Sequence, residues 1–326
     1  MRSLLLFLLF IVPVSTAQVS GSVPKPPWAS TAKPAEPSAA PAAAQDDNTI
    51  RVDVKLVNVF VTITDEHGRP VSTLGKENFQ VFEDGQTQKI SVFAKESELP
   101  LSIVVEIDTS LSTRKDLPLE LNSARRFAHS ILRPVDALAV YGFNEVVDQA
   151  VPFTADLRTI DHGIDHLPMG AATALYDAVY LGSQALESRQ GRKVMVIITD
   201  GGDTVSKTDY QEALRATQIS EAIVYSIIVV PIEASAGRDT GGEHALIQLS
   251  EDTGGKYFYA TTLPQLDQAF RAISDELRTQ YLLAYYPARR LADSDYRRIE
   301  VKLTGVPASS DYNARHRTGY YTSKLR

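Results

Sequence analysis

The middle of the chain alternates between continuous apolar segments and segments with helical periodicity. Three segments are apolar almost throughout and bounded by polar or small residues: LSIVVEI at 101–107, KVMVIITD at 193–200 and AIVYSIIVV at 222–230. Between and around them, apolar residues recur every three or four positions, as in 115–132 and 264–279, which is the spacing of an amphipathic helix. Apolar strands that alternate with such helices are typical of a mostly parallel sheet with helices on both faces. Residues 98–280 are therefore predicted to form a doubly wound α/β domain.

The segments on either side of this domain alternate between apolar and polar residues with a period of two. Residues 49–97 contain VNVFVTIT and the stretch QVFEDGQTQKISVF, which predicts a hairpin that turns at Asp84-Gly85. Residues 281–326 contain YLLAYY and RRIEVKL, and ARHRTGYYT is expected as one last strand. Each flank holds few strands for an independent domain. We expect the two flanks to pair as one β-sandwich into which the α/β domain is inserted; the alternative is two separate β appendages.

The N-terminus has the pattern of an exported protein. Arg2 precedes the apolar run LLLFLLFIVPV, and small residues follow at Ser15 and Ala17, so residues 1–17 are predicted to be a signal peptide cleaved after Ala17. An uncleaved anchor is the alternative, although the apolar run is short for a membrane span. Residues 18–48 are rich in Pro, Ala and Ser, a composition typical of a disordered linker. These features predict a secreted, periplasmic or cell-surface protein, and the absence of cysteine favours a bacterial source.

The overall composition excludes several classes of function. The formal net charge is -7, so the chain lacks the basic excess that attracts nucleic acid, and no nucleic-acid partner is expected. The chain contains no cysteine, which excludes disulfides, thiolate metal sites and thiol catalysis.

Polar side chains follow the predicted buried strands at the points where these strands end. Asp108, Ser110 and Ser112 follow the first strand, and Asp200 ends the segment KVMVIITD. Thr173 precedes a predicted helix in the segment GAATALYDAV. In an open α/β sheet, ligands bind outside the carboxyl ends of the strands, so these side chains are expected to converge. Carboxylate and hydroxyl oxygens without His or Cys suit Mg²⁺, and also Mn²⁺ or Ca²⁺, better than Zn²⁺ or Cu²⁺.

These residues, in this order, resemble a known family. DTSLST fits the pattern Asp-x-Ser-x-Ser, Thr173 lies in TALYDAV, and Asp200 lies in IITDGGD. Together they resemble the metal-ion-dependent adhesion site of von Willebrand factor A domains, and the resemblance covers roughly residues 98–280. With the signal peptide and the flanks EDGQTQKISVF and YLLAYYP, the chain is similar to a group of bacterial exported proteins that contain this domain.

The resemblance implies a metal site that takes part in protein binding. It implies that Ser110, Ser112 and Thr173 touch a divalent cation and that Asp108 and Asp200 act largely through water. A cation surrounded mainly by hydroxyls and water stays electrophilic, so it can take a carboxylate from a protein partner as its last ligand. Asp203 is a further candidate that would supplement or replace Asp200. The chain departs from the family pattern at Ala171-Ala172, where glycines are common, and at Thr113, where an apolar residue is common.

Two other classes of function stay open from the sequence. The second hypothesis is a structural or assembly protein with a vestigial metal site, which would capture no partner carboxylate. A hydrolase is the third hypothesis: Asp108-Thr109-Ser110 resembles part of an aspartic protease motif, but the chain has no second copy of it. None of the six His residues follows a core strand as a base would, and no Gly-x-Ser-x-Gly motif is present. A non-enzymatic binding protein is therefore the leading expectation.

Overall fold

The computed structural model describes residues 56–95, 99–115, 117–230, 240–289, 296–307 and 311–322. The predicted signal peptide, the predicted linker and residues 49–55 lie outside the described residues.

A six-stranded sheet forms the centre of the α/β part. Five of its strands are parallel, and the edge strand β7 runs antiparallel to β6. In spatial order the strands are β10 (Lys256–Ala260), β9 (Ile223–Val229), β8 (Arg192–Thr199), β5 (Leu101–Asp108), β6 (Ala137–Phe143) and β7 (Val147–Thr154). All eight residues of β5 are buried, because this strand lies in the interior of the sheet and is covered on both faces.

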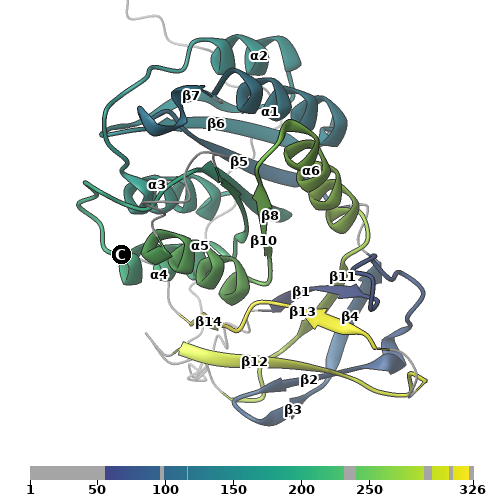
Figure 1. The fold of residues 1–326 in the computed structure, drawn as a ribbon. Helices are drawn as coiled ribbons and strands as arrows, with labels where there is room; N and C mark the ends of the chain where they lie inside the picture. Colours follow the sequence, from purple (N-terminus) through teal and green to yellow (C-terminus); the bar gives the residue numbers. More distant parts are fainter. Residues whose placement is uncertain are drawn as a thin grey trace, which may run out of the picture. The chain divides into compact units, whose positions relative to one another are not determined.

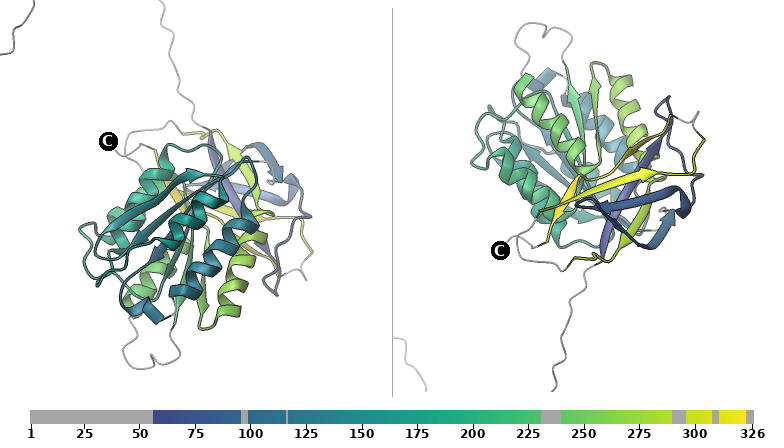
Figure 2. Two further views of the ribbon diagram at one scale, coloured as in Figure 1. Left: turned by 90° about the horizontal axis from the view of Figure 1, so that it is seen from above. Right: turned by 90° about the horizontal axis from the view of Figure 1, so that it is seen from below.

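Helices cover both faces of this sheet (Figures 1 and 2). Three of them share a hydrophobic core with one face: α1 (Leu117–Ile131), α2 (Leu157–Asp165) and α6 (Leu263–Leu277). Three others share a core with the opposite face: α3 (Leu175–Glu187), α4 (Tyr210–Ser220) and α5 (Thr240–Thr253). The predicted doubly wound fold class is confirmed. None of the helices described is both long and apolar enough to cross a bilayer.

Two antiparallel sheets share the third hydrophobic core and form a β-sandwich. One sheet has the order β13 (Asn313–Arg315), β1 (Val57–Thr64), β11 (Tyr281–Tyr285) and β4 (Ile90–Lys95). The other has the order β14 (Gly319–Tyr321), β12 (Tyr296–Leu303), β2 (Phe79–Glu83) and β3 (Gln86–Gln88), with the 3-10 helix η1 (Lys76–Asn78) before β2. The β2–β3 hairpin turns at Asp84 and Gly85, both with positive φ (47° and 79°), which explains the Asp-Gly pair at this position.

Strands from before and after the α/β part pair directly in both sheets. In the first sheet β11 lies between β1 and β4, and in the second β12 lies beside β2. Figure 2 shows these early and late segments side by side. The sandwich is therefore assembled from both flanks, and the α/β part is inserted between β4 and β11.

The C-terminal segment differs from the single last strand expected from ARHRTGYYT. It forms two short strands, β13 and β14, which belong to different sheets. The residues between them leave the sheets because they bind other parts of the chain. Arg317 donates to the Asn58 carbonyl and lies 3.7 Å from the Glu221 carboxylate, while the Thr318 N–H donates to the Asp252 carbonyl. A period-two pattern of apolar residues cannot reveal such a crossing. The alternation of apolar and polar residues stays the same when the chain passes from one sheet to the other.

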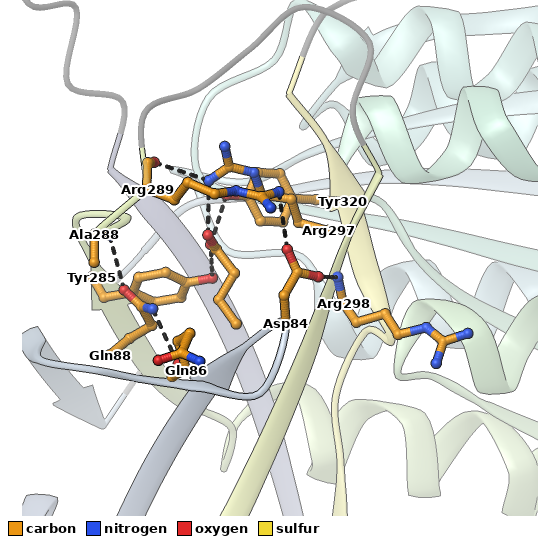
Figure 3. A network of polar contacts seen from close by, with 10 residues as sticks. Asp84, Gln86, Gln88, Tyr285, Ala288, Arg289, Arg297, Arg298 and Tyr320 are labelled. Atoms are coloured by element: carbon orange, nitrogen blue, oxygen red, sulfur yellow. Dashed lines mark hydrogen bonds and ion pairs between the residues drawn. The ribbon is translucent and has the colours of Figure 1, made fainter.

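A buried polar network joins the strands of the sandwich (Figure 3). Arg297 donates to one oxygen of the Glu83 carboxylate at 2.8 Å, and the hydroxyls of Tyr285 and Tyr320 each donate to the other oxygen at 2.8 Å. Glu83 and Arg297 are 3% and 0% exposed. Because Glu83 comes from the early flank and its three partners from the late flank, this network specifies that the two flanks pair.

Replacing Glu83 by Ala should strongly destabilise the sandwich. The substitution leaves the buried Arg297 charge without its carboxylate, and breaking a buried ion pair in this way costs about 3–5 kcal/mol. Urea denaturation followed by circular dichroism measures the change in the free energy of unfolding. The matched control is Glu300→Ala on neighbouring β12, where the Glu300–Lys302 pair is exposed and its loss should cost about 0–1 kcal/mol. Equal losses in the two variants would contradict the role of the network.

His316 is held in one neutral tautomer between the sandwich and the α/β part. Its Nε2 accepts a hydrogen bond from the Val301 N–H at 3.1 Å, and its Nδ1 donates to the Arg317 carbonyl at 2.8 Å. Next to it, Gly254 has φ 81°, and a Cβ there would lie 2.5 Å from the His316 carbonyl carbon, so the chain segments are in close contact. Burial lowers the pKa of His316 below its ordinary value of 6.5, against a smaller opposing effect of its hydrogen bond to Arg317.

The lowered pKa of His316 predicts a loss of stability in acid. The unfolded chain takes up a proton near pH 6.5 and the folded chain only at lower pH, so stability present above 6.5 is lost as the pH falls through the folded pKa. Urea denaturation between about pH 7 and pH 5 should show this loss in the wild type. His316→Gln, which keeps an acceptor for Val301, should show less of it. His67→Gln, at an exposed turn, is the control and should behave like the wild type. Identical pH profiles for wild type and His316→Gln would refute the assignment.

Candidate metal site at the carboxyl edge of the sheet

The parallel pairing of β5 and β8 places the ends of the two strands beside each other. Their register pairs Ile107 with Ile198, so Asp108 and Thr199 follow at the same edge. The Thr199 hydroxyl donates to Asp108 Oδ2 at 2.6 Å, and the Ser110 N–H donates to Asp108 Oδ1 at 2.9 Å. Asp108 is fully buried at the tip of the strand. Burial raises the pKa of its carboxyl, and the hydrogen bonds from Thr199 and Ser110 offset this effect in part.

Four of the predicted site residues form one chain of polar contacts. From Asp108 the chain passes to Ser110, whose hydroxyl lies 3.0 Å from the Ser112 hydroxyl. Ser112, the first residue of the 3-10 helix η2 (Ser112–Lys115), donates to Asp200 Oδ1 at 2.9 Å. Two loops that are far apart in sequence therefore bring two carboxylates and two hydroxyls together.

Thr173 reaches the same edge through its backbone. Its N–H donates to the Thr204 hydroxyl at 2.9 Å, and its carbonyl accepts from the Thr204 N–H at 2.8 Å. The following N–H, of Ala174, donates to the carbonyl of Asn144, whose side chain donates to Thr109 at 3.0 Å. Thr173 is thus joined to the loops after β5 and β8, although within the described residues its hydroxyl does not bond to the other four predicted ligands.

Glu145 holds the loop that departs from the family pattern. Its Oε2 accepts hydrogen bonds from the N–H groups of Ala171 at 2.6 Å and Ala172 at 3.3 Å. Hydrogen bonds from its own N–H, from Ala171 and from Ala172 lower the pKa of Glu145. The loop before Thr173 is therefore fixed by a carboxylate from the β6–β7 turn. Sequence reasoning missed Glu145; the signal that could have found it is its position after β6, another strand that ends at this edge.

Asp203 lies at the start of α3 and does not join the chain of contacts. Its carboxylate accepts from the N–H groups of Tyr176 and Ser206, both at 3.3 Å, and from the Ser206 hydroxyl. Asp177 is engaged in a similar way and accepts from the N–H groups of Lys207 and Thr208. Both carboxylates therefore fasten the β8–α4 loop to α3.

Glu106 is a second carboxyl in the interior below the site. It is fully buried on β5, two residues before Asp108, and neither of its oxygens has a hydrogen-bond partner among the described residues. Burial raises its pKa to about 8, so this carboxyl is protonated at neutral pH. Gly182 of α3 leaves the space that the Glu106 side chain fills, because a Cβ on Gly182 would lie 2.2 Å from Glu106 Oε1. The sequence did not point to Glu106, because β5 is otherwise almost continuously apolar.

The donor set fits a hard divalent cation. The residues that converge supply only carboxylate and hydroxyl oxygens. In the part of the chain that the structure describes, no cluster of three His, Cys, Asp or Glu side chains could hold a metal. His129 pairs with Asp161 at 3.0 Å, and His162 and His166 stack on α2, so none of these rings belongs to the site.

Among the described residues Asp108 has no cationic side chain beside it, whereas three other buried carboxylates do. Glu83, Asp136 and Glu276 are each at most 3% exposed and each forms an ion pair with an arginine: Arg297, Arg133 and Arg315 respectively. Asp108 has only hydroxyl and N–H donors among the described residues. Since a buried carboxylate is costly without a compensating charge, its environment is suited to a bound cation.

The comparisons with known proteins identify one domain family. Residues 103–202 match the family model of the von Willebrand factor type A domain. A comparison with curated proteins gives no match.

Several solved structures have a similar fold. Proximal thread matrix protein 1 from the mussel byssus, with a zinc-occupied MIDAS motif, has a TM-score of 0.50 at 13% identity, covering 60% of this chain and 50% of that chain. The von Willebrand factor type A protein from Catenulispora acidiphila has a TM-score of 0.47 at 10% identity, covering 81% of this chain and 74% of that one. An aerotolerance-related membrane protein from Bacteroides fragilis NCTC 9343 has 0.44 at 18%, covering 54% and 98%. At these identities the likeness concerns the fold.

Replacing Glu145 by Ala should loosen the loop that carries Thr173. The N–H groups of Ala171 and Ala172 lose their acceptor, so their amide protons should exchange faster with solvent, while global stability changes little because Glu145 is exposed. Hydrogen exchange followed by NMR measures this at the two amides. Asp148→Ala, on exposed β7, removes the same charge nearby and should leave both rates unchanged. Unchanged protection in Glu145→Ala would show that another contact holds the loop.

Proposed function

Because this chain contains a von Willebrand factor type A domain, we propose that it is an exported, non-enzymatic module that binds a protein partner through a divalent cation. The observation that carries the proposal is the buried Asp108 carboxylate, which lies among hydroxyl donors and has no cationic side chain beside it in the described residues.

The residues at the edge of the sheet divide the work of holding the cation. A bound Mg²⁺, Mn²⁺ or Ca²⁺ would supply an electrophilic centre that accepts a carboxylate of the partner. Ser110, Ser112 and Thr173 offer neutral hydroxyl oxygens, which leave the positive charge of the ion largely uncompensated. Asp108 and Asp200 supply the negative charge, and their hydrogen bonds to Thr199 and Ser112 fix where the carboxylates point.

Several features favour binding over catalysis. A hydrolytic serine needs a base that is aligned with its hydroxyl. Among the described residues, the polar side chains beside Ser110 and Ser112 are each other and the carboxylates of Asp108 and Asp200, and no His hydrogen-bonds to either hydroxyl. The mussel byssus protein with the same fold carries its zinc in a MIDAS motif, which supports an ion at this edge. The signal peptide predicted at residues 1–17 supports export, and the module would then be secreted, periplasmic or at the cell surface.

Mg²⁺ should raise the melting temperature of the wild-type protein relative to EDTA. At a concentration of 100 times the dissociation constant, ligand binding adds about 2.7 kcal/mol to the free energy of unfolding. Asp108→Asn removes the buried charge and should abolish this metal-dependent difference, whatever it does to stability without metal. Thermal melting by circular dichroism measures both. The control Asp161→Asn alters a half-buried helix residue that pairs with His129 away from the candidate site, and it should keep the full difference.

A wild-type melting temperature that is the same in Mg²⁺, Mn²⁺, Ca²⁺ and EDTA would overturn the proposal. The domain would then serve a structural or assembly role with a vestigial site. A metal-dependent shift that persists in Asp108→Asn would place the ion elsewhere in the chain.

A further inference from the structure

Exposed apolar side chains gather around the candidate metal site. Single exposed apolar residues are common on proteins, but a group at one place marks an interaction surface. Among the described residues, four large apolar side chains on four different loops at this edge are exposed: Leu111, Val146, Met169 and Val205. We call these four residues the apolar collar. They lie in the loops β5–η2, β6–β7, α2–α3 and β8–α4.

Hydrogen bonds between these loops fix the collar around the site. Leu111 stands between Ser110 and Ser112, which are themselves in contact. Met169 is held on both sides, since the Pro168 carbonyl accepts from Asn144 at 3.2 Å and the Gly170 N–H donates to the Thr109 carbonyl at 3.1 Å.

The other two collar residues are fixed in the same way. The Val205 N–H donates to the Thr173 carbonyl at 3.3 Å. Val146 follows Glu145, which binds the loop of Ala171 and Ala172, and its own N–H donates to the Asn144 side chain at 3.0 Å. The loops that carry the apolar collar are therefore held by hydrogen bonds to the same loops that carry the predicted ligands.

A divalent cation bound at the candidate site would favour an acidic partner. The Glu145 carboxylate accepts from N–H groups of the α2–α3 loop and the Asp203 carboxylate from the Tyr176 N–H of α3, so their charge is partly compensated within the domain. A bound divalent cation would be the centre of positive charge, and the collar would form an apolar rim around it. A small carboxylate could satisfy the ion but would leave the collar in water.

We propose that the occupant is a protein loop with an acidic residue flanked by large apolar side chains. This inference rests on the proposed function and adds a chemical class of partner to it. The acidic side chain binds the cation, and the flanking side chains bury the collar, so the collar determines which carboxylates are accepted.

Three synthetic hexapeptides test this proposal: one with Asp between two Leu, one with Asp between two Ser, and one with Asn between two Leu. Binding is measured by fluorescence anisotropy in Mg²⁺ and in EDTA. The Leu-flanked Asp peptide should bind about 10-fold more tightly than the Ser-flanked one, since burial of apolar side chains favours association. The Asn peptide should not bind, and EDTA should abolish all binding.

Matched variants locate the effect. Val146→Ser and Met169→Ser should each weaken the Leu-flanked Asp peptide by roughly 3- to 10-fold and leave the Ser-flanked peptide unchanged. Val135→Ser is the control: Val135 is 62% exposed and Val146 55%, but Val135 precedes β6 and lies at the opposite edge of the sheet. All three variants should keep the Mg²⁺-dependent melting shift.

Two failures can be told apart. If both Asp peptides bind equally and need Mg²⁺, the collar proposal is overturned and the proposed function stands. If neither peptide binding nor the melting temperature depends on the metal, the proposed function falls and the collar proposal with it. A Mg²⁺-dependent dimer in sedimentation experiments that is lost in Met169→Ser would make a second copy of this chain the occupant, and would overturn the choice of partner.

Discussion

The parallel pairing of β5 with β8 is the constraint on which the site depends. It fixes the two strand ends side by side, so that Asp108 meets the Thr199 hydroxyl and the loop after β5 meets Asp200. Parallel pairing requires a crossover between strands, and here the crossovers are the helices that bury both faces of β5. The burial that stabilises the sheet is therefore also what makes the Asp108 carboxylate costly and raises its pKa. A slip of one residue in this register would move Asp108 away from Thr199 and break the chain of contacts.

Three buried carboxylates of this protein offset the cost of burying a negative charge in three different ways. Glu83 accepts hydrogen bonds from Arg297 and two tyrosine hydroxyls, which suits a group that specifies strand pairing inside a core. Glu106 has no partner among the described residues and a raised pKa, so protonation resolves its burial. Asp108 is intermediate: it accepts hydrogen bonds from neutral donors, and no arginine or lysine in the described part of the chain pairs with it. Of the three environments, that of Asp108 is the one that a cation from solution would complete.

Much of the fold could be predicted from periodicity, because the buried strands and amphipathic helices have different repeats. The turn at Asp84-Gly85 was also predictable, since both residues adopt positive φ. The crossing between β13 and β14 was not, because it depends on contacts of Arg317 and Thr318 with distant loops. For the site, Asp108, Ser110, Ser112 and Asp200 follow from their places after strands, whereas Glu145 supports Thr173 through a backbone contact that no local pattern shows. Asp203 is close to Asp200 in sequence, but its carboxylate binds the start of α3 and does not join the chain of contacts.

The way the α/β part is inserted explains why its carboxyl edge can serve a partner. The chain enters from β4 and leaves into β11, and these two strands are paired, with Lys95 opposite Tyr281. β5 begins and α6 ends at the same edge of the sheet. Three contacts to the sandwich among the described residues lie at this edge: Glu221 and Gly254 precede β9 and β10, and Glu276 is near the end of α6. The Asp108 loops and the apolar collar lie at the opposite ends of the parallel strands. Attachment and candidate binding site are thus separated by the length of the sheet, so that the contacts that fasten the two parts together do not compete with those offered to a partner.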